Sequence, residues 1–297
     1  MRHAAEMRVG TIILQTQPWS AMAEAFRTAA QIGYDVAYVA DHLTHPSIAG
    51  RWLADGFAVL AAAATATTRI DLGTLVASAV IRNPVTLARA AATVDDISGG
   101  RLVLGLGAGT AGDAVADRGS APTTKQMADR LSDVVGALEA LWAGEPDFVG
   151  DRATYRDVLT APVAPGRGRP FTMIAAHGPR GLALAAAHGD GWSTYGGAAS
   201  VPLAPQEFWR LLATQSAELT RHCEERDRDP ASVRRSVLLG YGTVQPLADV
   251  ASYVAAVERA EADSFDELVV YWPDGERGDR FWSDLDVHAE ALTRLAH

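Results

Sequence analysis

Eight short apolar runs recur along this chain, and each is followed by a stretch with helical periodicity. The runs lie at 9–14, 36–40, 70–76, 101–106, 171–176, 191–195, 236–242 and 267–272. Most are almost continuously apolar, which is typical of strands buried on both faces of a parallel sheet. The helical stretches lie at 20–33, 54–67, 84–97, 123–143, 179–188, 205–226, 246–262 and 280–296. This alternation predicts an α/β fold of the (β/α)8 TIM-barrel type.

We expect one barrel domain over residues 1–297. That length could hold two domains, but it is also ordinary for a single barrel of this type. One stretch, 145–170, is rich in Gly, Pro and charge and interrupts the rhythm. Because the strand–helix alternation resumes beyond it, we interpret it as an insertion after the fourth helix rather than as a linker between domains.

Composition limits the partners and the compartment. The net charge of −10 and the absence of a Lys/Arg-rich block disfavour nucleic acid and anionic membranes as partners. No apolar run reaches the roughly 18 residues of a membrane span, and the first ten residues lack the core of a signal peptide. The single cysteine, Cys223, cannot form an internal disulfide, which fits a reducing compartment. We therefore expect a cytoplasmic protein.

Barrels of this type carry their active sites in the loops that follow the carboxyl ends of the strands. The loop after the second predicted strand contains Asp41 and His42, and then His45. A carboxylate beside a histidine is a common means of orienting an imidazole for acid–base chemistry. The alternative is a turn capped by Asp41 and an ordinary buried histidine. We predict no metal site, because His42 and His45 lack a third ligand and an H-E-x-x-H pattern.

The loop after the fifth predicted strand reads A-A-H-G-P-R-G, and it opens a helix at Pro179. Backbone N–H groups at a helix N-terminus favour an anion, and Arg180 adds a positive charge beside them. The sequence therefore predicts an anion site here, with an ordinary glycine–proline turn as the alternative.

Three glycines, Gly107, Gly109 and Gly112, spell G-x-G-x-x-G after the fourth run. A dinucleotide-binding turn needs a helix directly after it and an acidic residue at the end of the next strand. The residues after Gly112 contain another Gly and a Pro and have little apolar period, and the motif does not follow the first strand. We reject that interpretation, although glycines still allow a backbone to approach a ligand closely.

Four stretches in order, 36–43, 52–76, 81–109 and 169–197, resemble the bacterial luciferase-like monooxygenase family. The resemblance covers nearly the whole chain. It implies a TIM barrel that binds a flavin, or the deazaflavin coenzyme F420, at the carboxyl ends of the strands. It also implies a bulge behind the redox-active ring near 75–77, often with a non-proline cis peptide bond. The residues that it implies for coenzyme binding are Asp41, Leu75, Val76, Ala77, Gly107, Ala108, Gly109, His177, Gly178, Pro179 and Arg180.

The Asp41–His42 pair resembles the deazaflavin-using branch of the family, and so do the compact length and the Arg-rich, Lys-poor composition of a high-GC, actinobacterial type of genome. The implied function is an F420-dependent oxidoreductase that transfers a hydride between the coenzyme and a small-molecule substrate. In that reading His42 and Asp41 are catalytic: His42 handles the accompanying proton, while Asp41 orients His42 or bonds the ring. The resemblance is also compatible with a homodimer.

Alternatives remain open at this point. An FMN-dependent monooxygenase shares most of the motifs. A non-redox barrel enzyme is disfavoured because the rim loops lack paired carboxylates, and a coenzyme-binding carrier without catalysis is a further reading. The chain also departs from the family at Thr110–Asp113, where relatives often have an aromatic or acidic residue, and this leaves Asp113 as the nearest candidate acid.

Overall fold

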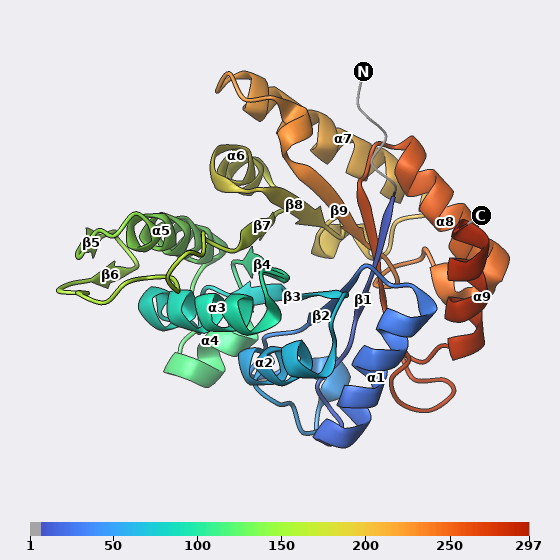
Figure 1. The fold of residues 1–297 in the computed structure, drawn as a ribbon. Coiled ribbons are helices and arrows are strands. Elements are labelled where there is room, and N and C mark those ends of the chain that lie inside the picture. Colours follow the sequence, from blue (N-terminus) through green and yellow to red (C-terminus); the bar gives the residue numbers. More distant parts are fainter. Residues whose placement is uncertain (1–6, 297) are drawn as a thin grey trace. The chain divides into compact units, whose positions relative to one another are not determined.

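The computed structural model describes residues 7–296. Its main strands form a closed barrel in the order β1-β10-β9-β8-β7-β4-β3-β2 (Figure 1). These strands are β1 (Arg8–Ile12), β2 (Val36–Val39), β3 (Asp71–Ser78), β4 (Leu102–Gly107), β7 (Phe171–Ala175), β8 (Gly191–Thr194), β9 (Arg234–Leu238) and β10 (Glu267–Tyr271). All eight coincide with predicted apolar runs, so the expected (β/α)8 fold is confirmed.

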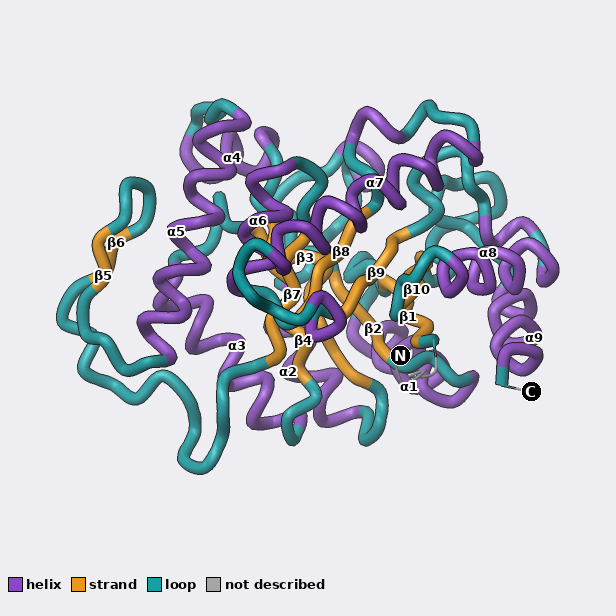
Figure 2. Tube along the Cα trace, turned by 90° about the horizontal axis from the view of Figure 1, so that it is seen from above, coloured by secondary structure: helices purple, strands orange, loops and turns teal. Residues whose placement is uncertain are grey.

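The helices follow the strands in the predicted alternation. They are α1 (Trp19–Ile32), α2 (Gly56–Ala66), α3 (Pro84–Ser98), α4 (Ala111–Arg118), α5 (Thr124–Trp142), α6 (Pro179–His188), α7 (Pro205–Glu224), α8 (Val250–Ala262) and α9 (Leu285–Leu295). Neighbouring helices pack against each other, as α6 and α7 do in Figure 2. Within residues 7–296, no helix is both long and apolar enough to cross a membrane.

Local sequence signals fix several helix ends. The side chain of Asn83 accepts hydrogen bonds from the backbone N–H groups of Val85 and Thr86, and Pro84 occupies the first helical position of α3. Gly33 and Gly144, which were expected to end helices, have φ angles of 108° and 84°. Those left-handed conformations favour glycine and stop a helix.

By their internal contacts, the described residues divide into two compact units. Unit 1 holds residues 7–14, 24–38 and 173–296, and unit 2 holds 15–23 and 39–172. The core of unit 1 includes the fully buried side chains of Trp192 and Tyr253. The core of unit 2 includes Leu72, Leu104 and Leu138, which are equally buried.

In unit 2, the pairing of β3 with β4 is irregular at the site of the expected bulge. The register shifts between Thr74 and Ala77, and the peptide bond between Leu75 and Val76 is cis. Both features were implied for residues 75–77 by the family resemblance, and both are confirmed.

The close approach of β3 requires glycine at the end of β4, at Gly107, and just after it, at Gly109. A Cβ atom at Gly107 would lie 2.3 Å from Cγ2 of Val76, and one at Gly109 would lie 2.3 Å from Oγ of Ser78. Gly109 also has a φ of 83°, a backbone conformation that residues other than glycine rarely adopt. The strand–glycine pattern therefore reflects strand packing at the bulge of β3.

The structure corrects one premise of the sequence analysis. The residues after Gly112 were expected to lack a helix, but α4 begins at Ala111 and includes Gly112. The Thr110 side chain accepts a hydrogen bond from the backbone N–H of Asp113, and Gly119 ends the helix with a φ of 72°. The dinucleotide-binding fold is still excluded, because β4 belongs to the closed barrel. Three predicted boundaries also shift by four or five residues: β9 ends at Leu238 rather than 242, α8 begins at Val250 rather than 246, and α9 begins at Leu285 rather than 280.

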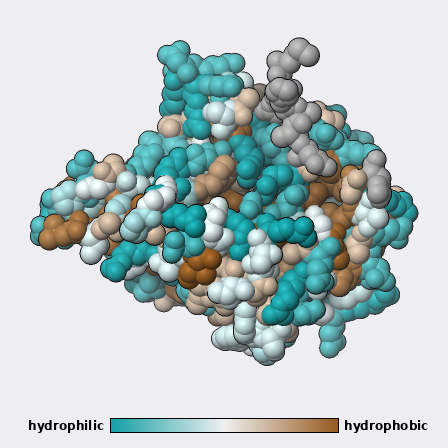
Figure 3. Space-filling view, viewed as in Figure 1, coloured by the Kyte–Doolittle hydropathy of each residue, from teal (hydrophilic) through white to brown (hydrophobic). Residues whose placement is uncertain are grey.

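The Gly- and Pro-rich stretch 145–170 contains an antiparallel hairpin of β5 (Phe148–Val149) and β6 (Thr154–Tyr155). The Asp133 side chain in α5 accepts a hydrogen bond of 3.1 Å from the backbone N–H of Ala153 and so ties the hairpin to that helix. Val149 is 64% exposed. The hydrophobic colour at the left edge of Figure 3 lies over this hairpin.

Candidate functional site

In unit 2, the imidazole of His42 is held by the carboxylate of Asp113. Nδ1 of His42 lies 2.8 Å from Oδ2 of Asp113. The other carboxylate oxygen accepts hydrogen bonds from the backbone N–H groups of Leu43, at 2.8 Å, and Thr44, at 3.1 Å. The hydroxyl of Thr110 donates to Oδ2 at 2.8 Å. This set of donors anchors the loop after β2 to the first turn of α4.

The surroundings of Asp113 keep it ionised. Its burial raises the pKa, but the hydrogen bonds from His42, Thr110 and the backbone N–H of Thr44 outweigh this effect and lower the pKa to about 2. A carboxylate only accepts hydrogen bonds, so Nδ1 of His42 carries a hydrogen. The other ring nitrogen, Nε2, is left to exchange a proton with a ligand, and the His42 side chain is 28% exposed.

The sequence suggested that the adjacent Asp41 could orient His42. In the structure, the hydrogen-bond partner of His42 is Asp113 instead. The side chain of Asp41 is 4% exposed and accepts two hydrogen bonds from Arg82, Nε–Oδ2 at 3.1 Å and Nη2–Oδ1 at 2.5 Å. It also accepts one from the backbone N–H of Ser78 at 3.1 Å. A bidentate guanidinium satisfies both oxygens of a buried carboxylate, which explains why Asp41 faces Arg82.

Arg82 joins two carboxylates. Its Nη2 also lies 2.7 Å from Oδ2 of Asp55, the residue that caps the start of α2. Burial lowers the pKa of Arg82, but Asp41 and Asp55 outweigh this effect and raise it above its ordinary value. Arg82 therefore ties together the loop after β2, the end of β3 and the start of α2.

At the end of β3, Ser78 carries an unusual hydroxyl. The residue is 1% exposed, and its Oγ has no hydrogen-bond partner among residues 7–296. It lies against the backbone of Gly109. Buried polar atoms are normally hydrogen-bonded, so an unpaired one points to a missing polar partner. Of the predicted coenzyme-binding residues nearby, Gly107 is buried, whereas Ala108 and Gly109 are partly exposed.

In unit 1, His177 follows β7 and is fixed from two sides. Its Nδ1 lies 3.0 Å from Oγ1 of Thr194, and its backbone carbonyl accepts a hydrogen bond of 3.0 Å from the amide of Gln215. Burial lowers the pKa of His177 to about 4, so the ring is neutral at neutral pH. A Cβ atom at Gly197 would lie 3.2 Å from Cβ of His177, so glycine gives the ring its space.

The predicted anion-binding residues Gly178, Pro179 and Arg180 are exposed at the start of α6. Gly178 is the N-cap residue, and no side chain there accepts hydrogen bonds from the first turn. This leaves the positive end of the helix dipole facing outward beside Arg180. Among residues 7–296, no group of three or more His, Cys, Asp or Glu side chains is placed to hold a metal ion.

Sequence reasoning missed Arg82 as a site residue, and it named Asp113 only as a nearby acid. The spacing Thr110-x-x-Asp113 is a capping pattern that could have indicated α4 and placed Asp113 in its first turn. Arg82 offered no comparable signal, because the partner of a buried carboxylate is set by the folded chain.

The comparisons with known proteins agree with this fold. Residues 2–241 match the family model of the luciferase-like monooxygenases. The chain therefore belongs to the luciferase-like monooxygenase family. A solved F420-dependent secondary alcohol dehydrogenase, in complex with an F420–acetone adduct, matches with a TM-score of 0.78 and 18% identity, over 98% of each chain.

Two curated relatives are more similar in sequence. The F420-dependent glucose-6-phosphate dehydrogenase of Beutenbergia cavernae is 32% identical over 166 residues, which are 55% of this chain and 49% of that protein. The phthiodiolone/phenolphthiodiolone dimycocerosates ketoreductase of Mycobacterium bovis is 30% identical over 197 residues, 64% of this chain and 47% of that protein. The chain thus spans about half the length of these relatives.

Proposed function

We propose that this member of the luciferase-like monooxygenase family is a coenzyme F420-dependent oxidoreductase that transfers a hydride between the deazaflavin and a small organic substrate. The observation that carries the proposal is the His42–Asp113 pair, an imidazole held in one tautomer by an ionised carboxylate. The sequence relative from Beutenbergia cavernae is F420-dependent by name, which supports this coenzyme.

The described residues fit such a coenzyme. In unit 2, the unpaired hydroxyl of Ser78 offers a polar contact, and Gly109 beside it presents a backbone without a side chain. In unit 1, the exposed start of α6 with Arg180 suits a phosphate group. When bound, the deazaflavin supplies hydride chemistry at its ring, and the protein supplies position and charge.

His42 is the proton-handling residue in this proposal. Its Nδ1–H is donated to Asp113, so Nε2 either accepts or donates the proton that accompanies the hydride. Asp113 stabilises the imidazolium that forms when Nε2 takes up a proton, because the carboxylate stays charged. Asp41 acts through Arg82 and the backbone of Ser78, and so it positions the loop that carries His42.

An FMN-dependent monooxygenase is the second candidate, and the family to which the chain belongs favours it. Oxygen uptake separates the two. With reduced FMN in air-saturated buffer, we expect the protein to consume no more oxygen than a protein-free control does. Enhanced uptake coupled to oxygenation of an added organic compound would favour the monooxygenase. A cytoplasmic location, a homodimer and a single domain over residues 1–297 remain predictions from the sequence.

A further inference from the structure

A row of aromatic rings lines the carboxyl ends of β8, β9 and β10 in unit 1. The ring centroids of Tyr195 and Tyr241 are 5.5 Å apart, and those of Tyr241 and Tyr271 are 6.3 Å apart. Phe281 continues the row at 4.3 Å from Tyr271. We call these four residues the aromatic wall. At its other end, Tyr195 meets the ring of His177 edge-on at 4.4 Å.

The three tyrosines of the wall are only partly buried. Within residues 7–296, no group forms a hydrogen bond with the hydroxyl of Tyr195 or of Tyr271. Burial raises the pKa of Tyr195, Tyr241 and Tyr271, so all three phenols keep their protons at neutral pH. The wall therefore combines ring faces with neutral hydrogen-bond donors.

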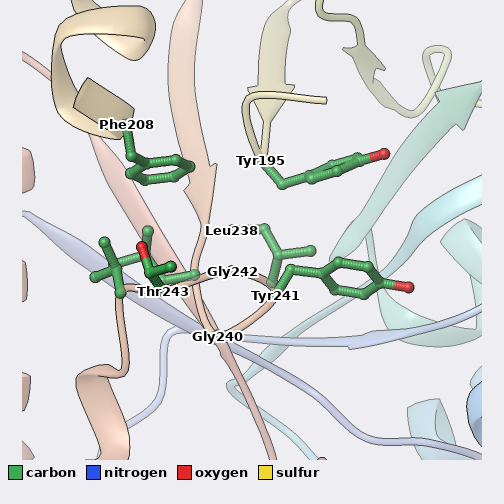
Figure 4. A pocket seen from close by; sticks show the side chains of 9 residues that line it. Tyr195, Phe208, Leu238, Gly240, Tyr241, Gly242 and Thr243 are labelled. Atoms are coloured by element: carbon green, nitrogen blue, oxygen red, sulfur yellow. The ribbon is translucent and has the colours of Figure 1, made fainter. Parts of the chain in front are cut away.

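A shallow, open pocket adjoins the wall (Figure 4). Tyr195 and Tyr241 point in the same direction there, away from Phe208, with Leu238 between them. The nine lining residues include no charged side chain: Tyr195, Phe208, Leu238, Leu239, Gly240, Tyr241, Gly242, Thr243 and Val244. Burying an unpaired charge in such surroundings is costly, so the pocket disfavours an ionised ligand group.

Arg280 is the cation beside the wall, and the protein itself engages it. Its guanidinium lies 4.4 Å from the ring centroid of Tyr241, and its Nη2 donates a hydrogen bond of 2.9 Å to the backbone carbonyl of that residue. Both contacts hold the guanidinium of Arg280 against the ring of Tyr241. Recognition of a ligand anion would compete with both of these contacts.

Resting on the proposed function above, we propose that the aromatic wall binds the substrate and that the substrate is an uncharged, planar, conjugated carbonyl compound. The ring faces suit a planar π system, and the hydroxyls of Tyr195 and Tyr271 suit a carbonyl oxygen. Reduction of such a compound adds one hydride to a carbon of the conjugated system and one proton to the carbonyl oxygen. Both electrons come from the reduced coenzyme, which is oxidised.

The test is binding of 2-methyl-1,4-naphthoquinone to the full chain, measured by equilibrium dialysis without coenzyme. We expect saturable binding that Tyr195→Leu and Tyr241→Leu each weaken by about two- to tenfold. Tyr195→Phe keeps the ring and tests the hydroxyl alone, and it serves if a leucine variant does not fold. Phe148→Leu, in the hairpin of unit 2, is the matched aromatic control and leaves binding unchanged.

Glucose 6-phosphate is the competing probe, because it is charged and not planar. We expect it to leave the quinone bound. Displacement of the quinone by glucose 6-phosphate would overturn the assignment. Equal quinone binding by the wild type and all three tyrosine variants would overturn it as well. A separate F420 titration of the same samples reports on the proposed function. If the wild-type protein binds the quinone but not F420, the result contradicts the proposed coenzyme. The assignment of the aromatic wall as a substrate site then still stands.

Discussion

Nδ1 of His42 lies 2.8 Å from Oδ2 of Asp113, although 71 residues separate them in the chain. The loop after β2 supplies the imidazole, and the first turn of α4 supplies the carboxylate. Because Asp113 also accepts hydrogen bonds from the N–H groups of Leu43 and Thr44, it fixes both the ring and the backbone that carries it.

Replacing His42 by Ala should lower turnover by about 10²–10⁴-fold and leave coenzyme binding largely intact, because a general acid–base residue contributes about that much. Asp113→Asn should lower turnover less and move the pH–rate profile to lower pH, because loss of the anion disfavours the protonated imidazole. Asp117→Asn, in the same helix but exposed, is the control. A pH profile for Asp113→Asn identical to that of the wild type would contradict the role of Asp113.

Replacing Arg82 by Gln should destabilise the fold by about 3 kcal/mol, because the buried carboxylate of Asp41 loses its partner. Urea unfolding measures this change in the free energy of unfolding. Arg118→Gln removes the exposed pair with Asp117 and should cost less than about 1 kcal/mol. Equal effects of the two substitutions would show that the Asp41–Arg82 contact does not hold unit 2 together.

Replacing Gly109 by Ala should lower the melting temperature, because the new Cβ would lie 2.3 Å from Oγ of Ser78 and 2.5 Å from Cγ2 of Val80. Gly119→Ala is a control at a similar φ, 72°, with no atom within 4 Å of the new Cβ. The difference between the two melting temperatures therefore reports mainly the clash at Gly109. We expect Gly109→Ala to lower the free energy of unfolding by about 1–3 kcal/mol more than Gly119→Ala does. Equal melting temperatures would argue against the close packing of β3 on β4.

Acid should destabilise the protein partly through His288. This residue is fully buried, with Nδ1 2.5 Å from the hydroxyl of Tyr34 and Nε2 2.8 Å from Oγ of Ser283. Burial lowers its pKa from 6.5 to about 4. Between those values the unfolded chain binds a proton that the native ring does not, so stability present above about pH 6.5 is lost as the pH falls to about 4.

The loss attributable to His288 is up to about 3 kcal/mol. His288→Gln should make the free energy of unfolding less dependent on pH between about 6.5 and 4. Urea unfolding at several pH values in that window checks this. His177, whose pKa burial also lowers to about 4, remains as a second source of the same dependence. A pH dependence unchanged by the substitution would contradict the assignment to His288.

The strands were predictable because burial on both faces leaves a continuous apolar run, and the helix starts were predictable where a cap such as Asn83 precedes Pro84. The short helix α4 was missed because its eight residues are mostly polar or small and carry little apolar period. The partners of His42 and Asp41 could not be predicted. Asp113 and Arg82 are distant from them in the sequence, and only the folded chain brings each pair together.

A fluorescence titration of the protein with F420 and with FMN tests most directly which coenzyme the protein binds. We predict saturable binding of F420, tighter than that of FMN by about tenfold or more. Arg180→Glu should weaken F420 binding, because it places a negative charge beside the helix start proposed for the phosphate. Tight binding of FMN with no binding of F420 would contradict the account.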